Sequence, residues 1–295
     1  MSVPIALPAA LAYGIADFAG GIASRRAPVL AVTAGVQVVG LVALLPFVVL
    51  VGGAPSAAAF GLGAAGGLAG AAGLLLYLRG LAVGPMGVVA PLSAVVGAGL
   101  PLLIGIAGGE RPSALTLFAI VVALVAILLA NAGTARGRGT RTGPLLALGA
   151  GVGFALFFVA LDATPQDCGL WPLLVGRLTT VPLLTILALG AVRRTPVPAG
   201  RMAAPDRPDS VLDVWLRAGV TRLLLVSGVF DTGANVLFLV ATRTGDLGVS
   251  AVVVSLYPVI VVLLARFVLR ERLTGMQIGS AGLALGASVL LAVSS

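Results

Sequence analysis

The sequence predicts an all-α polytopic membrane protein whose ten transmembrane helices form two inverted five-helix repeats. Of its 295 residues, 59% are hydrophobic and only 9% are charged, which is not the composition of a soluble domain. The apolar residues fall into stretches of about 20, the length that an α-helix needs to cross a bilayer. The second half of the chain also repeats the pattern of the first half after an odd number of spans.

Ten spans can be assigned in order from these apolar stretches. They are residues 3–23, 29–51, 57–78, 86–107, 114–132, 144–161, 171–191, 221–241, 247–268 and 275–293. The first segment contains Asp17 and lacks a basic start, so we interpret it as a retained helix rather than a signal peptide. The third span is rich in glycine, and because small residues let helix backbones approach closely in lipid, it is expected to pack tightly.

The repeat is visible as a constant offset of 161 residues that needs no gap from Gly67 onward. The matched pairs are Gly67 with Gly228, Leu76 with Leu237, Gly84 with Gly245, Gly87 with Gly248, Glu110 with Glu271, Arg111 with Arg272, Ala123 with Ala284 and Leu129 with Leu290. An odd number of intervening spans inserts the second copy upside down relative to the first. Inverted repeats are the arrangement by which many secondary transporters build a substrate site near the membrane midplane.

The repeat divides the chain into a first unit at 1–133, a Gly/Arg-rich linker at 134–143 and a second unit at 144–295. Before the gapless region an offset of about 140 pairs Gln37 with Arg177, which implies an insertion in the second copy. The insertion is expected between Arg193 and Val220, where four prolines exclude a regular helix until about Ser210. Residues 211–216 fit either a short interfacial helix or a solvated turn.

The placement of arginine predicts the orientation of the chain in the membrane. The net charge of +8 comes from 18 arginines without any lysine. Fifteen arginines lie in the loops after odd-numbered spans, whereas the other loops carry only Arg111 and Arg243, and Arg177 lies inside a span. Because cytoplasmic loops are enriched in basic residues, this distribution predicts a multi-pass protein of the cell membrane with both termini outside the cytoplasm.

The composition also argues against several classes of site. A single cysteine, Cys168, and the absence of histidine argue against a disulfide framework and the usual zinc or haem sites, so we expect no metal and no cofactor. The arginines lie in short loops beside apolar spans, so we expect no nucleic-acid partner. The expected partners are the lipid bilayer and a small-molecule substrate, and the sequence is compatible with proton coupling and with a homodimer.

Two segments in particular resemble a known family. Residues 267–290, FVLRERLTGMQIGSAGLALGASVL, look like the end of an EamA-type repeat of the drug/metabolite transporter superfamily, and GGERPSALTLFAIVVALVAILLA at 108–130 is the weaker counterpart. The start, AYGIADFAGGIASRR, is similar to the opening helix of one branch. The resemblance covers essentially the whole chain. It implies ten helices, with spans one to four and six to nine around a central cavity and spans five and ten at the periphery. It also implies an exporter of small molecules with both termini in the cytoplasm, which conflicts with the arginine count.

Three charged residues inside spans are the leading candidates for the site, because a charge at mid-helix costs about 2.5–3.5 kcal/mol on insertion scales and faces the bundle interior. Asp231 has Asn235 one turn later on its face, so it could titrate a proton or bind a substrate amine. Alternatively it forms a structural ion pair with Arg177, which could itself hold a substrate carboxylate or phosphate. Asp17, with Tyr13 one turn before it, is a candidate gate or coupling carboxylate, or else pairs with arginines of the following loop.

Weaker candidates for substrate or coupling-ion binding are Gln37, Tyr77 and Tyr257, each of which is also a common packing residue. Four prolines are expected to interrupt their helices: Pro91, Pro101, Pro182 and Pro258. Glu110 and Glu271 lie at span ends, and we interpret them as anchors of the turn into the last helix of each repeat rather than as ligands.

The function that these features favour is a secondary transporter, and an exporter in particular, that moves a small polar or amphipathic metabolite or drug by alternating access. A lipid scramblase or a non-transporting membrane scaffold is the alternative from another class. An intramembrane aspartyl-type enzyme is disfavoured, because the surroundings of Asp17 (YGIADF) and Asp231 (GVFDTG) lack the Gly-Asp motif of such enzymes. We therefore expect no catalytic residues.

Overall fold

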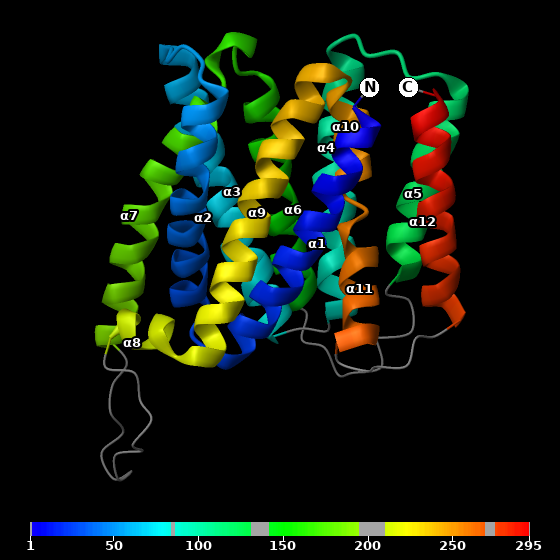
Figure 1. The fold of residues 1–295 in the computed structure, drawn as a ribbon. Helices are drawn as coiled ribbons and strands as arrows, with labels where there is room; N and C mark the ends of the chain where they lie inside the picture. Colours follow the sequence, from blue (N-terminus) through cyan, green and yellow to red (C-terminus); the bar gives the residue numbers. More distant parts are fainter. Residues whose placement is uncertain (1, 84–85, 131–141, 195–209, 269–274, 295) are drawn as a thin grey trace.

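The computed structural model describes residues 2–83, 86–130, 142–194, 210–268 and 275–294, and within these ranges it is built of upright, packed α-helices (Figure 1). The helices are α1 (Val3–Arg26), α2 (Val29–Val51), α3 (Ala57–Val83), α4 (Met86–Ala107), α5 (Ala114–Ala130), α6 (Thr142–Asp162), α7 (Trp171–Arg194), α8 (Val211–Leu216), α9 (Ala218–Thr244), α10 (Leu247–Val254), α11 (Tyr257–Val268) and α12 (Gly275–Ser294). A short 3₁₀ helix, η1 (Gln166–Cys168), precedes α7. The expected linker lies outside the described residues except for Thr142 and Gly143, which begin α6.

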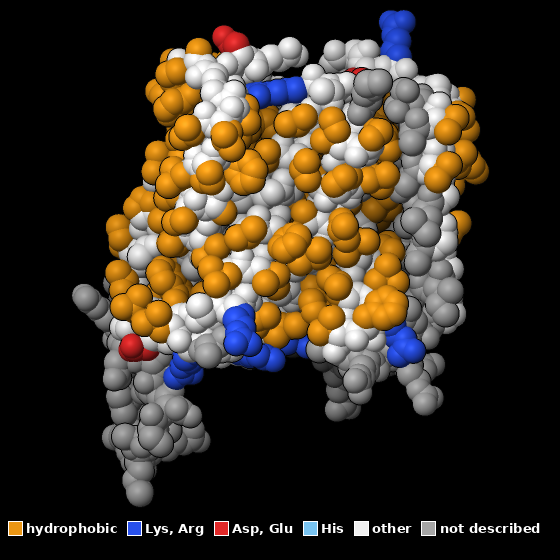
Figure 2. Space-filling model, viewed as in Figure 1, with side chains coloured by type: hydrophobic (Ala, Val, Ile, Leu, Met, Phe, Trp, Pro, Cys, Tyr) orange, Lys and Arg blue, Asp and Glu red, His pale blue; other side chains and the backbone are white. Residues whose placement is uncertain are grey.

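Long apolar helices make this chain a multi-pass membrane protein. In the described ranges, seven helical segments are long and apolar enough to cross a membrane, and shorter apolar helices run through Leu92–Ala107 and Ala114–Leu129. Large apolar side chains cover the outside of the bundle, and Figure 2 shows them as a broad band between two more polar ends. An apolar exterior of this kind is the surface that lipid requires.

The expected ninth span at 247–268 is broken into two helices, in agreement with the interruption expected at Pro258. The chain leaves helical conformation at Ser255 and Leu256, between α10 and α11. Pro258 explains the break, because its nitrogen cannot donate to the carbonyl four residues earlier and its ring crowds that carbonyl. The breaks expected at Pro91, Pro101 and Pro182 are absent, since α4 and α7 continue as helices through these prolines.

The segment 211–216 is a helix rather than a turn. Ser210 caps it, since its hydroxyl accepts from the Asp213 N–H at 3.1 Å and the Asp213 carboxylate accepts from the Ser210 N–H at 2.8 Å. This reciprocal pair is a capping box. Trp215 then anchors α8 to the start of α2 by donating its indole N–H to the carbonyl of Ala31 at 2.8 Å.

The glycines of α3 let this helix lie against two neighbours at close range. On one face, Gly63 and Gly67 meet Gly176 of α7, where a methyl group on Gly176 would lie 3.0 Å from the Gly63 carbonyl oxygen. On the other face, Gly70 lies against the Phe157 ring of α6, and a methyl group there would lie 3.1 Å from the ring. The tight packing expected for the third span is therefore present, and it brings α6 and α7 together around α3.

The remaining contacts place α5 and α12 together at one side of the bundle (Figure 1). The main contacts among the other helices join α1 to α9, α2 to α7 and α9, α3 to α6 and α7, and α4 to α6 and α10. The two chain termini lie at the same end of the bundle (Figure 1). Arginine side chains gather mainly at the opposite end, as Figure 2 shows.

Candidate functional site

A cavity of about 830 Å³, counting its open mouth, lies in the centre of the bundle. Its walls come from α1 to α4 of the first half and from α6, α7, α9, α10 and α11 of the second half, and from neither α5 nor α12. The lining includes six of the seven predicted site residues: Asp17, Gln37, Arg177, Asp231, Asn235 and Tyr257. The seventh, Tyr77, is fully buried beside the cavity and packs edge-on against Tyr257, with ring centroids 6.3 Å apart.

An ion pair between α7 and α9 lies in this cavity. One terminal nitrogen of Arg177 donates to the Asp231 carboxylate, and the two side chains are only 9% and 16% exposed. The same nitrogen lies 3.3 Å from the hydroxyl of Thr232, which donates in turn to the Gly40 carbonyl of α2 at 3.1 Å. The structure therefore contains the ion pair that the sequence offered as one reading of Asp231, and Thr232 links it to a third helix.

Gly40 provides the space that this arrangement needs. A methyl group at Gly40 would lie 2.8 Å from the central carbon of the Arg177 guanidinium and 2.7 Å from the Thr232 hydroxyl. Both distances are shorter than van der Waals contact, so only glycine fits here without displacing the ion pair. Sequence reasoning did not single out Gly40, because it is one of 41 glycines.

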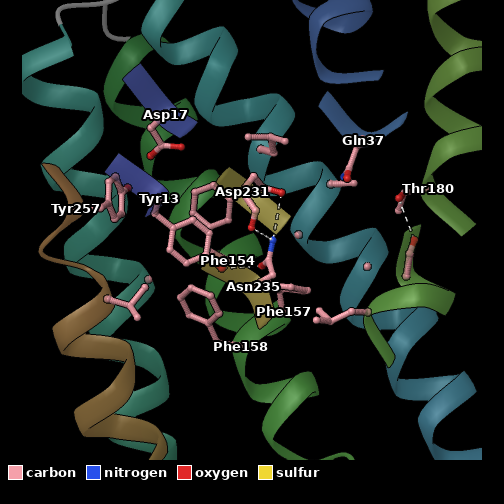
Figure 3. A pocket seen from close by; sticks show the side chains of 18 of the residues that line it. Tyr13, Asp17, Gln37, Phe154, Phe157, Phe158, Thr180, Asp231, Asn235 and Tyr257 are labelled. Atoms are coloured by element: carbon pink, nitrogen blue, oxygen red, sulfur yellow. Dashed lines mark hydrogen bonds between the residues drawn. The ribbon is translucent and has the colours of Figure 1, made fainter. Parts of the chain in front are cut away.

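The polar network continues from Asp231 to α1. The amide nitrogen of Asn235 donates to the Asp231 carboxylate at 3.1 Å and to its backbone carbonyl at 2.7 Å. The Asn235 amide oxygen accepts from the Tyr13 hydroxyl at 2.6 Å. Asp231 and Asn235 thus share one face of α9, as their spacing predicts, and Figure 3 shows the two hydrogen bonds between them.

Asp17 also lines the cavity, and Figure 3 shows it near Tyr13 and Tyr257. Asp17 forms no ion pair with Arg25 or Arg26, although the sequence allowed that pairing. The Tyr257 hydroxyl is within 3.2 Å of the Ser93 hydroxyl of α4. Asp17 therefore takes no part in the ion pair of Arg177 with Asp231, although it lines the same cavity.

Aromatic rings from α6 form the apolar part of the wall. Phe154, Phe157 and Phe158 line the cavity, and Figure 3 shows the three together below Asp231. Phe158 packs against Tyr13 with ring centroids 6.3 Å apart. Sequence reasoning missed these rings, although their spacing along α6 places them near one another on the helix. The cavity therefore has both apolar and charged surfaces.

Gln37 is the polar residue of α2 in the wall. Its side chain is 6% exposed, and its amide oxygen accepts no hydrogen bond from the described residues. A buried polar atom without a partner costs about 1–3 kcal/mol. Such an acceptor is suited to a ligand that brings a donor into the cavity.

Glu110 lies at the end of the bundle that holds the termini, outside the spans. Its carboxylate accepts from the backbone N–H groups of Leu247 at 2.9 Å and Gly248 at 3.3 Å, so it caps the start of α10. It therefore anchors a helix of the other half of the chain, whereas the sequence predicted only that it anchors the turn into the last helix of its own repeat. Burial raises the pKa of the Glu110 carboxyl above its ordinary value, and the N–H of Gly248 partly offsets this rise. Glu271 lies outside the described residues.

The fold and cavity define a class, that of multi-pass helical membrane proteins with a charged central cavity. Residues 141–293 match the model of the EamA-like transporter family. This match covers more than half of the chain, and the chain therefore belongs to that family.

Solved structures share the fold. A crystal structure described only as that of a protein matches this chain with a TM-score of 0.68 and 19% sequence identity, over 100% of this chain and 99% of that chain. At this identity the likeness shows the fold alone. No curated protein sequence matched the chain significantly.

Proposed function

We propose that this protein is a secondary transporter that exports a small polar or amphipathic metabolite or drug by alternating access. One observation carries the proposal: four spans from each half of the chain surround a cavity that contains the Arg177 and Asp231 ion pair. Charges inside a membrane protein mark substrate or ion pathways. The family membership favours transport over catalysis.

The helix contacts support the inverted repeat on which alternating access rests. If α1, α2, α3 and α5 correspond to α6, α7, α9 and α12, the contact of α3 with α6 has its counterpart in α9 with α1. The contact of α3 with α7 likewise corresponds to that of α9 with α2. Two equivalent sets of contacts let one half rock against the other around a fixed site.

The ion pair is a contact between α7 and α9 that a bound substrate can break. A substrate carboxylate or phosphate would compete with Asp231 for the Arg177 guanidinium, which binds such groups with two parallel hydrogen bonds. A substrate amine would instead compete with Arg177 for Asp231. In either case the exchange changes the contacts between α7 and α9, and a ligand that prefers one state shifts the equilibrium toward it.

An aspartyl-type enzyme is a poorer fit to the cavity. Such a mechanism needs two carboxylates that share a proton. The Asp231 carboxylate is instead paired with Arg177 and accepts from Asn235, and no hydrogen bond joins it to Asp17 in the described residues.

We also propose that both termini lie outside the cytoplasm. The support is the cluster of arginine side chains at the end of the bundle opposite the termini (Figure 2). A fluorescent protein that folds only in the cytoplasm, fused after Ser295, tests this proposal. No fluorescence is expected, with a fusion in the loop after α7 as the positive control, and a bright fusion at Ser295 would reverse the orientation.

The transport proposal is tested by comparing metabolites inside and outside cells that overproduce the wild type or Asp231→Asn. Asp167→Asn is the matched control, since it removes an exposed carboxylate that does not belong to the cavity lining. We expect a compound enriched outside the cells with wild type and the control, but not with Asp231→Asn. Sealed vesicles with purified protein then measure its flux. Absence of flux for a broad panel, with folded protein, would refute the proposal, and gradient-independent lipid movement would point to a scramblase.

A further inference from the structure

The charges that line the cavity do not balance. Two carboxylates, Asp17 and Asp231, face one guanidinium, that of Arg177, among the described lining residues. Arg177 is paired with Asp231. Among the described residues Asp17 is thus left without a cationic partner in a largely apolar cavity, where an isolated charge is costly. An ionised Asp17 would therefore leave the cavity with one uncompensated negative charge, which a bound cation would neutralise.

A buried hydroxyl without a hydrogen bond lies beside this carboxylate. Tyr77 of α3 is fully buried, and its hydroxyl makes no hydrogen bond of good geometry to the described residues. Tyr77 contacts Tyr257, and Figure 3 shows Tyr257 beside Asp17. Its ring lies edge-on to that of Tyr257, whose hydroxyl is close to Ser93. Oxygen atoms from α3, α4 and α11 are thus gathered near the free carboxylate of α1.

The break in span nine adds backbone oxygen to the same region. Val254 and Ser255, at the end of α10, line the cavity. The carbonyl of Val254 would accept from residue 258 in a continuous helix, but Pro258 has no N–H to donate. The C-terminal end of a helix also carries a partial negative charge. A methyl group on Gly14, one turn before Asp17, would lie 3.0 Å from the Tyr257 carbonyl oxygen, so the break lies against α1 close to this carboxylate.

From these observations we infer a binding site for one monovalent cation at Asp17, between α1, α3 and the break between α10 and α11. Carboxylate, hydroxyl and carbonyl oxygens are the ligands that hard cations prefer, and unwound backbone at a cavity binds coupling ions in other transporter folds. One uncompensated charge fits a monovalent ion, and no cluster of three or more acidic, histidine or cysteine side chains suited to a multivalent metal is present in the described residues.

This cation is either an alkali metal ion or the ammonium group of the cargo, since both fit the same oxygen atoms. Its part in transport rests on the proposed function, whereas binding does not. The adjacent aromatic rings, including Tyr13, favour either source, because aromatic faces attract cations.

Thermal unfolding of the purified full-length protein tests the site without any gradient or flux. The probes are sodium, potassium and benzylammonium chlorides, each exchanged against N-methylglucamine chloride at constant ionic strength. A ligand that binds only the folded state raises the unfolding temperature with its concentration. For at least one probe we expect the unfolding temperature of the wild type to rise in proportion to the logarithm of the concentration once this exceeds the dissociation constant. A response to sodium or potassium identifies an alkali ion, and a response to benzylammonium alone identifies a cargo ammonium.

Three variants locate the binding. Asp17→Asn should abolish the rise, Tyr77→Phe should increase several-fold the concentration at which the rise begins, and Asp167→Asn should behave as the wild type. If Asp17→Asn does not fold, Tyr77→Phe still tests the site. A wild type that responds to none of the three cations, or only to a lower pH, would overturn the site. A response that survives Asp17→Asn unchanged would overturn it as well. Transport that fails while binding is retained would contradict the proposed function and leave the cation site standing.

Discussion

The Arg177 and Asp231 ion pair predicts an asymmetric result when its partners are removed one at a time. Asp231→Asn leaves a guanidinium that is 9% exposed and retains the Thr232 hydroxyl at 3.3 Å as its partner in the described structure. Because a guanidinium cannot lose its proton in a protein, the charge must stay buried. Removing one partner of a buried pair costs about 3–5 kcal/mol, and we expect Asp231→Asn to lie in that range.

The opposite change should cost less. Arg177→Met leaves the Asp231 carboxylate, which is 16% exposed, still accepts from the Asn235 amide at 3.1 Å, and can take up a proton. An unsatisfied buried group of this kind costs about 1–3 kcal/mol. The two single variants should therefore differ by about 2 kcal/mol, or roughly 30-fold in the folding equilibrium. The double variant should cost less than the two singles together, by about 0.5–3 kcal/mol.

The assay is the free energy of unfolding in mixed detergent micelles, measured for the four proteins at neutral pH and again at low pH. The cost of Arg177→Met should decrease at low pH, because protonation removes the unpaired charge of Asp231. Additive single costs, or a larger cost for Arg177→Met than for Asp231→Asn, would refute the view that a buried, mutually dependent pair joins α7 to α9.

Three further predictions concern packing and pH. Gly40→Ala should lower the free energy of unfolding by about 1–3 kcal/mol, because its methyl group would overlap the Arg177 guanidinium; Gly233→Ala, which has open space, is the control, and equal effects would contradict the packing argument. Glu110→Gln keeps an acceptor for α10 but removes a carboxyl whose pKa burial raises. Wild-type stability should therefore be highest below the ordinary value of 4.5 and fall as pH rises through the raised pKa, and the variant should lack this fall in thermal unfolding from about pH 4 to about pH 7; parallel curves would contradict it. Trp215→Phe should cost about 1 kcal/mol in the same unfolding assay, since it removes the hydrogen bond to Ala31, and an unchanged free energy would mean that this bond does not stabilise α8.

Much of the secondary structure could be predicted because the bilayer imposes a length on each apolar segment. Predicted starts at 29, 57, 86, 114, 171, 247 and 275 coincide with the starts of helices in the structure. The break between α10 and α11 agrees with the interruption expected at Pro258, but the prolines also predicted breaks that are absent, because a proline alone does not break every helix. Pro91 and Pro101 show this, as α4 continues through both.

The sequence by itself determined that this chain crosses the membrane many times and that Asp17, Arg177 and Asp231 lie within spans, because the cost of placing a charge in lipid depends on its position along an apolar segment. Only the tertiary structure decided that Arg177 pairs with Asp231 while Asp17 remains apart, and that Gly40 is the glycine that makes room for the pair. These facts depend on how each helix is rotated and how closely two backbones approach. Such quantities are set by the packing of residues that are far apart in the sequence, as Tyr13 and Asn235 are.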